Sequence, residues 1–285
     1  MRILLLGGTG EARRLADNLL PDHDVVSSLA GRTTDAVLPA GESRQGGFGG
    51  VPGLTSWLEQ HQIQAVVDAT HPFAATMTAH AVAACTALDL PLLVLRRPGW
   101  QQQPGDDWHW ASDAPAAAAL LPALIAPATA RPPSTRPSPG APPPPGTPPP
   151  PGTPPPPGTP SPPGRVFLTI GRQGLSAFAT TGLWTLARCV DPPDPIPTWC
   201  ELLLDRGPYD LPAERALLQT HQIDVLVTKN SGGTMTSAKL TAARELGIPV
   251  ILIERPPLPP AVAVAHTTDE VQAWLNKQAP AQPTG

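Results

Sequence analysis

Apolar residues in this chain follow two alternating patterns, one typical of buried strands and the other of amphipathic helices. In residues 2–6 (RILLL), every residue after Arg2 is apolar, as in a parallel strand covered on both faces. From Ala12 onward, apolar residues recur at i, i+3, i+4, i+7 and i+8, which predicts a helix with one buried stripe. Further strand-like runs occupy 24–30, 64–68 and 91–95, and a helix is predicted over 73–88. This alternation predicts parallel α/β sheets with right-handed crossovers.

The pattern occurs twice along the chain. The segment from residue 61, HQIQAVVDATHPFAATMTAHAVAACTALDLPLLVLRRP, matches the segment from residue 221, HQIDVLVTKNSGGTMTSAKLTAARELGIPVILIERP. Further upstream, ILLLGGTG matches FLTIGRQG, and this pairs Gly7 and Gly10 with Gly171 and Gly174. An ordered series of matches indicates an internal repeat. We therefore predict two doubly wound, Rossmann-like halves that face each other.

Between the halves, residues 126–164 have a composition that cannot form a core. The sequence PPPPGT occurs three times in succession there, flanked by further Pro, Ser and Thr. Such a segment favours solvated polyproline II interrupted by flexible glycines, or serves as a ligand for a proline-binding domain. We predict a first domain over 1–125, a disordered linker over 126–164 and a second domain over 165–285.

The composition and charge of the chain argue against several classes of binding partner. The 285 residues include 15% charged residues and carry a formal charge of −4, so no global positive field attracts nucleic acid or acidic lipid. The three cysteines form no CxxC pair and no metal-binding spacing with histidine, so no metal site is predicted. No apolar run reaches the ~18 residues of a membrane span. We expect a soluble, cytoplasmic protein that binds neither membrane nor nucleic acid.

A glycine-rich turn follows the first strand and suits a dinucleotide diphosphate. Glycines there let the backbone approach the phosphates, whose charge meets the free N–H groups of the next helix. The fingerprint is imperfect because Arg13 occupies its third glycine position. The alternative is a plain strand–helix turn. The predicted cofactor-binding residues of this turn are Gly7, Gly8, Thr9, Gly10 and Glu11.

The end of the second strand bears on the choice of cofactor. An NAD site usually places an acid there, bonded to the ribose 2′-hydroxyl. This sequence has SSLAGRT instead, with Ser28 and Arg32 and no carboxylate. A guanidinium with hydroxyl groups suits a 2′-phosphate. We therefore predict NADPH as the cofactor and Arg32 as its main discriminator.

The chain lacks the usual catalytic acid of many carbonyl reductases. Its single tyrosine, Tyr209, is followed four residues later by Ala213 rather than by lysine. A reductase without a tyrosine acid suits an electron-poor substrate, such as a conjugated imine-like carbon that takes hydride directly.

Cations gather after one strand of the second half. The loop VTKNSGG lies in the same position of the repeat as DATHPFA, and both should line one cleft at the carboxyl ends of the strands. Solvated surface charges are the alternative. The predicted substrate-binding residues in the second half are Arg172, Arg206, Lys229, Asn230, Ser231, Gly232, Gly233 and Lys239.

The motifs GGTGEA, SLAGRT, GGFGG, DATHPFA, RGP and KNSGGxxTSAKLxAAxELGIPV together resemble the precorrin-6A reductase family of cobalamin biosynthesis. The resemblance spans nearly the whole chain except residues 126–164. It implies two Rossmann-like domains, the first binding NADPH and the second the substrate. It also implies hydride transfer to one C=C bond of a polycarboxylate tetrapyrrole, and it makes transient contact with other enzymes of that pathway a possible further interaction.

Within DATHPFA, His71 is the residue of greatest interest. Pro72 disfavours the α region for it, which leaves it extended at a strand end. A turn residue, a contact to substrate or nicotinamide, and a general acid are the alternatives. We favour a role in lining and orienting the site, and we name His71 and Asp68 as candidate catalytic residues. Thr70 is a candidate for cofactor contact, and Phe73 for packing against a flat substrate ring.

Two other functions are compatible with the sequence. One is an NADP-dependent reductase of another conjugated imine. The other is a non-catalytic dinucleotide sensor whose proline tract recruits partners. The second half keeps its own cationic loops, which a sensor would not need, and this favours the reductase of a polyanionic tetrapyrrole.

Overall fold

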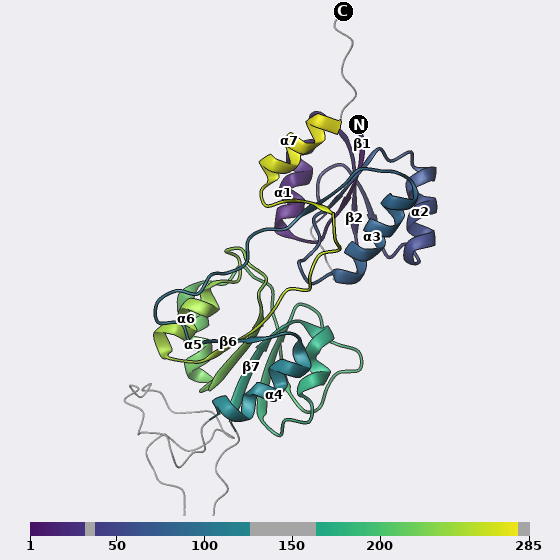
Figure 1. The fold of residues 1–285 in the computed structure, drawn as a ribbon. Helices are drawn as coiled ribbons and strands as arrows, with labels where there is room; N and C mark the ends of the chain where they lie inside the picture. Colours follow the sequence, from purple (N-terminus) through teal and green to yellow (C-terminus); the bar gives the residue numbers. More distant parts are fainter. Residues whose placement is uncertain (32–37, 126–163, 279–285) are drawn as a thin grey trace, which may run out of the picture.

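The computed structural model describes residues 1–31, 38–125 and 164–278, which form two α/β domains (Figure 1). Each domain contains a six-stranded sheet in which all neighbouring strands run parallel. The prediction of two Rossmann-like halves is confirmed.

The first sheet has the order β12-β5-β4-β1-β2-β3. Its central strand β1 contains the first apolar run of the sequence, and four of its five residues are buried. The elements of this domain are β1 (Arg2–Leu6), α1 (Gly10–Leu19), β2 (Asp24–Leu29), β3 (Glu42–Gln45), α2 (Gly50–Gln60), β4 (Ala65–Asp68), α3 (Ala75–Ala87), β5 (Leu92–Leu95), β12 (Ala263–Ala265) and α7 (Thr268–Gln278).

The second sheet has the order β6-β11-β10-β7-β8-β9, which is the same arrangement built on the second half of the repeat. Its elements are β6 (Trp108–Ala111), α4 (Ala114–Leu124), β7 (Arg165–Thr169), the 3₁₀ helix η2 (Arg172–Phe178), β8 (Trp184–Cys189), β9 (Glu201–Leu204), α5 (Leu211–Thr220), β10 (Val225–Lys229), α6 (Ala238–Leu246) and β11 (Val250–Ile253).

The two halves exchange their last strand–helix units, which the predicted domain boundaries did not include. Strand β6 and helix α4 precede the linker but belong to the second domain, because β6 pairs with β11. Strand β12 and helix α7 follow the second half of the repeat but belong to the first domain, because β12 pairs with β5. The boundaries 1–125 and 165–285 are therefore wrong in this respect. Residues 126–163 of the predicted linker lie outside the described residues.

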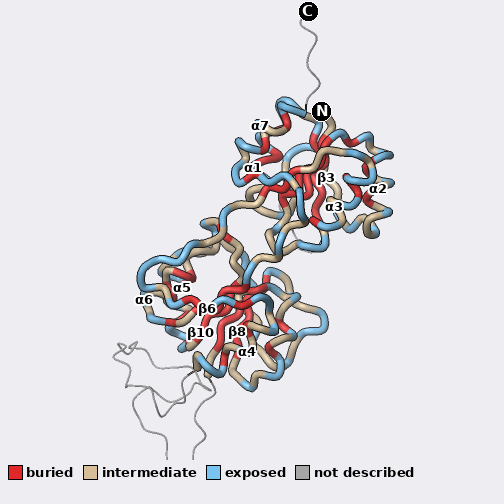
Figure 2. The backbone as a smooth tube through the Cα atoms, in the orientation of Figure 1, coloured by how far each residue is buried: buried red, intermediate tan, exposed pale blue. Residues whose placement is uncertain are grey.

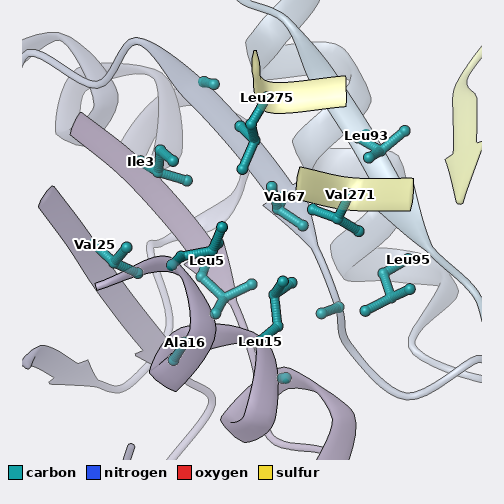
Figure 3. Close-up of a cluster of buried hydrophobic side chains, with 14 of the residues drawn as sticks. Ile3, Leu5, Leu15, Ala16, Val25, Val67, Leu93, Leu95, Val271 and Leu275 are labelled. Carbon is teal, nitrogen blue, oxygen red and sulfur yellow. The ribbon is translucent and has the colours of Figure 1, made fainter. Parts of the chain in front are cut away.

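Helix α7 completes the core of the first domain. Buried residues follow the central strands in both domains (Figure 2). In the first domain, Val271 and Leu275 of α7 pack among residues of β1, α1 and β4 (Figure 3). Both side chains are fully buried. Helix α7 is thus part of the first hydrophobic core. Within the described residues, no helix combines the length and apolar character needed to cross a membrane.

Leu275→Ala is expected to destabilise the first domain, although residue 275 follows the second half of the repeat. Removing a fully buried leucine side chain costs about 2–5 kcal/mol through lost burial and the cavity left behind. Amide hydrogen exchange, measured region by region, should become faster in β1 and β5. The control is Leu204→Ala, which changes an exposed leucine and should leave exchange in these strands unchanged. Faster exchange confined to β7 and β10 would contradict the strand exchange.

Candidate active site

The turn between β1 and α1 is held by neighbouring strands. The Gly7 N–H donates to the Ser28 carbonyl of β2 at 2.8 Å. Thr9 caps α1, because its Oγ1 accepts from the Ala12 N–H at 3.0 Å, and it also donates to the Ala69 carbonyl at 3.0 Å. The first N–H groups of α1 are thereby fixed at the carboxyl edge of the sheet, where they suit an anionic group.

This turn is open on one side and covered on the other. A Cβ at Gly8 would meet no atom within 4 Å, and the residue has φ +110°, which favours glycine. A Cβ at Gly10 would lie 3.2 Å from Sδ of Met235, a residue of the second domain. The turn therefore leaves room for a diphosphate at Gly8, while the second domain closes over Gly10.

A cavity of about 220 Å³ lies beside this turn. Its walls come from the carboxyl ends of four strands of the first sheet, the position at which ligands bind in open α/β folds. The exchanged segment leading into α7 supplies part of the wall. The lining residues are Thr9, Glu11, Arg14, Ala69, Thr70, Pro72, Leu95, Arg97, His266, Thr267 and Thr268.

Asp68 orients the loop that follows β4. Its buried carboxylate accepts hydrogen bonds from the Thr70 N–H at 3.0 Å, the Thr70 hydroxyl at 2.7 Å and the Thr78 hydroxyl at 2.6 Å. These bonds fix Thr70 at the cavity wall. The geometry favours Asp68 as a positioning residue, and its role in catalysis stays a prediction.

The next residues of this loop face the second domain. Phe73 packs against the apolar core of that domain, and Nζ of Lys229 lies 5.2 Å from the Phe73 ring centroid. The Phe73 N–H donates to Nδ1 of His71 at 3.3 Å. One loop thus presents Thr70 and Pro72 to the cavity and Phe73 to the cationic loop after β10.

The environment of His71 favours its neutral ring. Desolvation lowers its pKa most, and the positive charges of Arg97, Lys229, Arg255 and Lys239 lower it further, to about 3. Although the residue is open to solvent, which weakens these effects, both causes act in the same direction. With Nδ1 as an acceptor, the neutral ring carries its proton on Nε2. His71 is therefore suited to donating one hydrogen bond and unsuited to acting as an imidazolium acid.

Two arginines of the connections between the domains belong to this site. Arg97 follows β5; its Nη1 lies 2.7 Å from the Glu11 carboxylate, and its Nε donates to the Ser231 carbonyl at 2.8 Å. Arg255 follows β11 and donates to the carbonyls of Asn230 at 2.6 Å and Arg97 at 2.6 Å. Together they join the glycine turn of one domain to the cationic loop of the other. The sequence showed these arginines only as matching positions of the repeat.

Comparisons with known proteins agree with this arrangement. The family model "Precorrin-6x reductase CbiJ/CobK" matches residues 2–276. The chain belongs to this family. The precorrin-6A reductase of Rhodococcus erythropolis is 48% identical over 278 residues, covering 96% of this chain and 97% of that protein. The cobalt-precorrin-6A reductase of Priestia megaterium is 24% identical, covering 96% and 98%. The solved structure "CobK precorrin-6A reductase" is 38% identical, covers 100% of this chain and 99% of its own, and has a TM-score of 0.78.

In this member of the CbiJ/CobK family, several predicted substrate-binding residues hold the connection between the domains. Oδ1 of Asn230 accepts from the Trp100 N–H at 2.8 Å, and the Gly233 carbonyl accepts from Nε1 of Trp100 at 2.8 Å. A Cβ at Gly232 would lie 2.1 Å from the Pro98 carbonyl oxygen. Close packing therefore explains why this loop contains glycines. Contact with the substrate stays a prediction for Asn230, Ser231, Gly232 and Gly233.

Lys239 lies deeper than the sequence suggested. It is 5% exposed, and its Nζ lies 5.3 Å from the ring centroid of Trp100. Desolvation lowers its pKa to about 7, opposed by Glu214 and aided by Arg188. Lys239 contributes to the positive field at His71, and direct contact with a substrate stays a prediction.

The remaining candidates lie at the carboxyl edges of the sheets. Arg172 begins η2 after β7, and Arg206 follows β9, so both share this edge with Lys229. The Glu11 carboxylate is paired with Arg97, and its predicted cofactor contact is untested. Arg32 lies outside the described residues.

Among the described residues, no group of three or more His, Cys, Asp or Glu side chains could hold a metal ion.

Proposed function

We propose that this protein reduces one C=C bond of precorrin-6A in cobalamin biosynthesis and that the reductant is NADPH. The proposal follows from membership of the CbiJ/CobK family and its precorrin-6A reductases. One structural observation carries it: the loop after β4 lines the cavity beside the glycine turn with Thr70 and Pro72, and it meets Lys229 of the second domain through Phe73.

The first domain fits a dinucleotide. The open side of Gly8 and the N–H groups of α1 suit the diphosphate, and the adjacent cavity suits the nicotinamide half. A reduced nicotinamide, when bound there, supplies a hydride. The Thr9 and Thr70 hydroxyls donate to the Ala69 carbonyl and to the buried Asp68, so each can act as an acceptor for the cofactor. NADPH rather than NADH is favoured because the second strand ends in Ser27, Ser28 and Leu29 and has no acid there.

The second domain and the connections supply charges for an acidic macrocycle. Lys229, Arg97 and Arg255 each act on His71 with a positive charge, and charge-assisted hydrogen bonds from such cations to carboxylates are stronger than neutral ones. Nε2 of the neutral His71 ring can donate a hydrogen bond that orients the substrate. The reacting bond would then lie between the cavity and the cationic loop, close to the Phe73 ring.

Metal-free precorrin-6A is the favoured substrate. Precorrin-6A reductases from Rhodococcus erythropolis and Rhodobacter capsulatus are 48% and 40% identical to this chain, whereas the cobalt-precorrin-6A reductase of Priestia megaterium is 24% identical. Cytoplasmic localisation and transient contact with other enzymes of the pathway stay predictions.

An anaerobic assay of cofactor oxidation tests the proposal. We expect oxidation of NADPH that depends on metal-free precorrin-6A and yields a product reduced by two electrons, with slower turnover of cobalt-precorrin-6A and of NADH. Oxidation of NADPH by an unrelated conjugated imine, but not by either form of precorrin-6A, would favour the alternative reductase. Binding of NADPH without turnover of any of these substrates would favour the sensor.

A further inference from the structure

Arg44 forms a compact cluster at the carboxyl ends of β2 and β3. It pairs with Ser28 in the register of these parallel strands, and its Nη1 donates to the Ser28 hydroxyl at 2.8 Å and to the Gly46 carbonyl at 3.1 Å. Its Nη2 donates to the Gly47 carbonyl at 3.0 Å, and its guanidinium carbon lies 3.8 Å from the Phe48 ring centroid. The side chain is thus held by contacts on several sides.

The position of this cluster relates it to the glycine turn. The Ser28 carbonyl accepts from the Gly7 N–H, while the Ser28 hydroxyl accepts from Arg44. Ser28 therefore lies between the turn that suits a diphosphate and the guanidinium. In a dinucleotide-binding sheet, the end of the second strand is where the adenosine ribose lies, and a nearby arginine accommodates a 2′-phosphate.

Arg44 keeps capacity to bind a further anion. A guanidinium has five N–H donors. Within the described part of the chain, the Arg44 guanidinium makes three hydrogen bonds, to the Ser28 hydroxyl and to the carbonyls of Gly46 and Gly47. Desolvation lowers its pKa, but a guanidinium stays charged at neutral pH. A Cβ at Gly46 or Gly47 would meet no atom within 4 Å, so the backbone beside the guanidinium is open.

We propose that Arg44, assisted by the Ser28 hydroxyl, binds the adenosine 2′-phosphate of NADPH and thereby selects NADPH over NADH. The inference rests on the proposed function and adds to it a residue that recognises the phosphate. Stacking on Phe48 and the bonds to two carbonyls hold the planar donor group in place before the ligand arrives, which reduces the ordering cost of binding.

Adenosine 2′,5′-bisphosphate and adenosine 5′-monophosphate test the proposal without hydride chemistry, because they differ only in the 2′-phosphate. Calorimetric titration of the full chain should give tighter binding of the bisphosphate. Arg44→Gln should weaken binding of the bisphosphate by about 10- to 150-fold, the range expected for a charge-assisted hydrogen bond, and change binding of the monophosphate by less than about 2-fold. Arg44→Lys should recover part of the loss, because it restores the charge without the fork.

Arg2→Gln provides the matched control. Arg2 also joins the first three strands, through Asp24 of β2 and Glu42 of β3, but it lies at their amino ends. The Arg2→Gln variant should bind the bisphosphate and the monophosphate as tightly as the unmodified protein does.

The outcomes distinguish failure of the Arg44 proposal from failure of the proposed function. If the unmodified protein binds the two nucleotides equally well, the proposed preference for NADPH is itself wrong. If the unmodified protein discriminates and Arg44→Gln keeps the same ratio, Arg44 is not the phosphate-binding residue. If Arg44→Gln weakens binding of both nucleotides equally, the proposal is also overturned, because Arg44 would then only maintain the conformation of the loop.

Discussion

Gly8→Val is expected to abolish tight binding of NADPH, raising its dissociation constant by more than about 100-fold. Gly8 adopts φ +110°, and its position faces open space rather than protein atoms. A valine there strains the backbone by about 1–3 kcal/mol and places a side chain where the diphosphate would approach. Fluorescence titration with NADPH measures the loss directly.

Gly182→Val is the matched control for strain. Gly182 has φ +68°, and a Cβ there would also meet no atom within 4 Å, but it lies in a turn before β8 of the second domain. This variant should lose stability and keep its affinity for NADPH. If both variants bind NADPH as the unmodified protein does, the glycine turn of the first domain is not the diphosphate site.

Lys229→Gln should raise the KM for precorrin-6A by about 10- to 150-fold, the effect of losing a charged hydrogen bond worth about 1.5–3 kcal/mol. Lys229 lies at the end of β10, and its Nζ lies near the Phe73 ring from the other domain. Desolvation lowers its pKa, so the lysine is partly removed from water before the substrate arrives. The affinity for NADPH should change little, because the glycine turn lies on the other domain.

Only three lysines occur in the chain, and Lys277→Gln is the control for loss of charge. Lys277 lies exposed in the last turn of α7. Steady-state kinetics under anaerobic conditions should show an unchanged KM for this variant. An unchanged KM for Lys229→Gln would remove Lys229 from the substrate site, and a parallel loss of NADPH affinity would assign it to the cofactor instead.

The sequence predicted the elements better than their assembly. Strands β1, β4 and β10 each contain an uninterrupted apolar run of three or four residues, and α1 has one apolar stripe, so local periodicity was sufficient to locate them. The exchange of β6 and β12 left no such signal. A short strand has the same local pattern whichever sheet it joins, and its partner is decided by contacts far away in sequence.

The site was predictable where side-chain chemistry coincides with a strand end. Lys229 ends strand β10, Phe73 belongs to the motif that follows the predicted strand 64–68, and the structure brings the two side chains together. Arg97 and Arg255 were not predicted as site residues, because their partners include the carbonyls of Asn230 and Ser231. Every residue offers such a carbonyl, so the identity of the side chains gave no indication of the pairing.

The most direct test is a crystal structure of the protein with NADP⁺ and the reduced tetrapyrrole bound together. We expect the diphosphate at Gly7 to Gly10, the nicotinamide in the cavity lined by Thr70, and carboxylates of the macrocycle at Lys229. The nicotinamide ring should then lie against the reduced bond of the pigment. A dinucleotide bound to the second sheet, or a macrocycle held away from the loop that contains His71, would contradict the account.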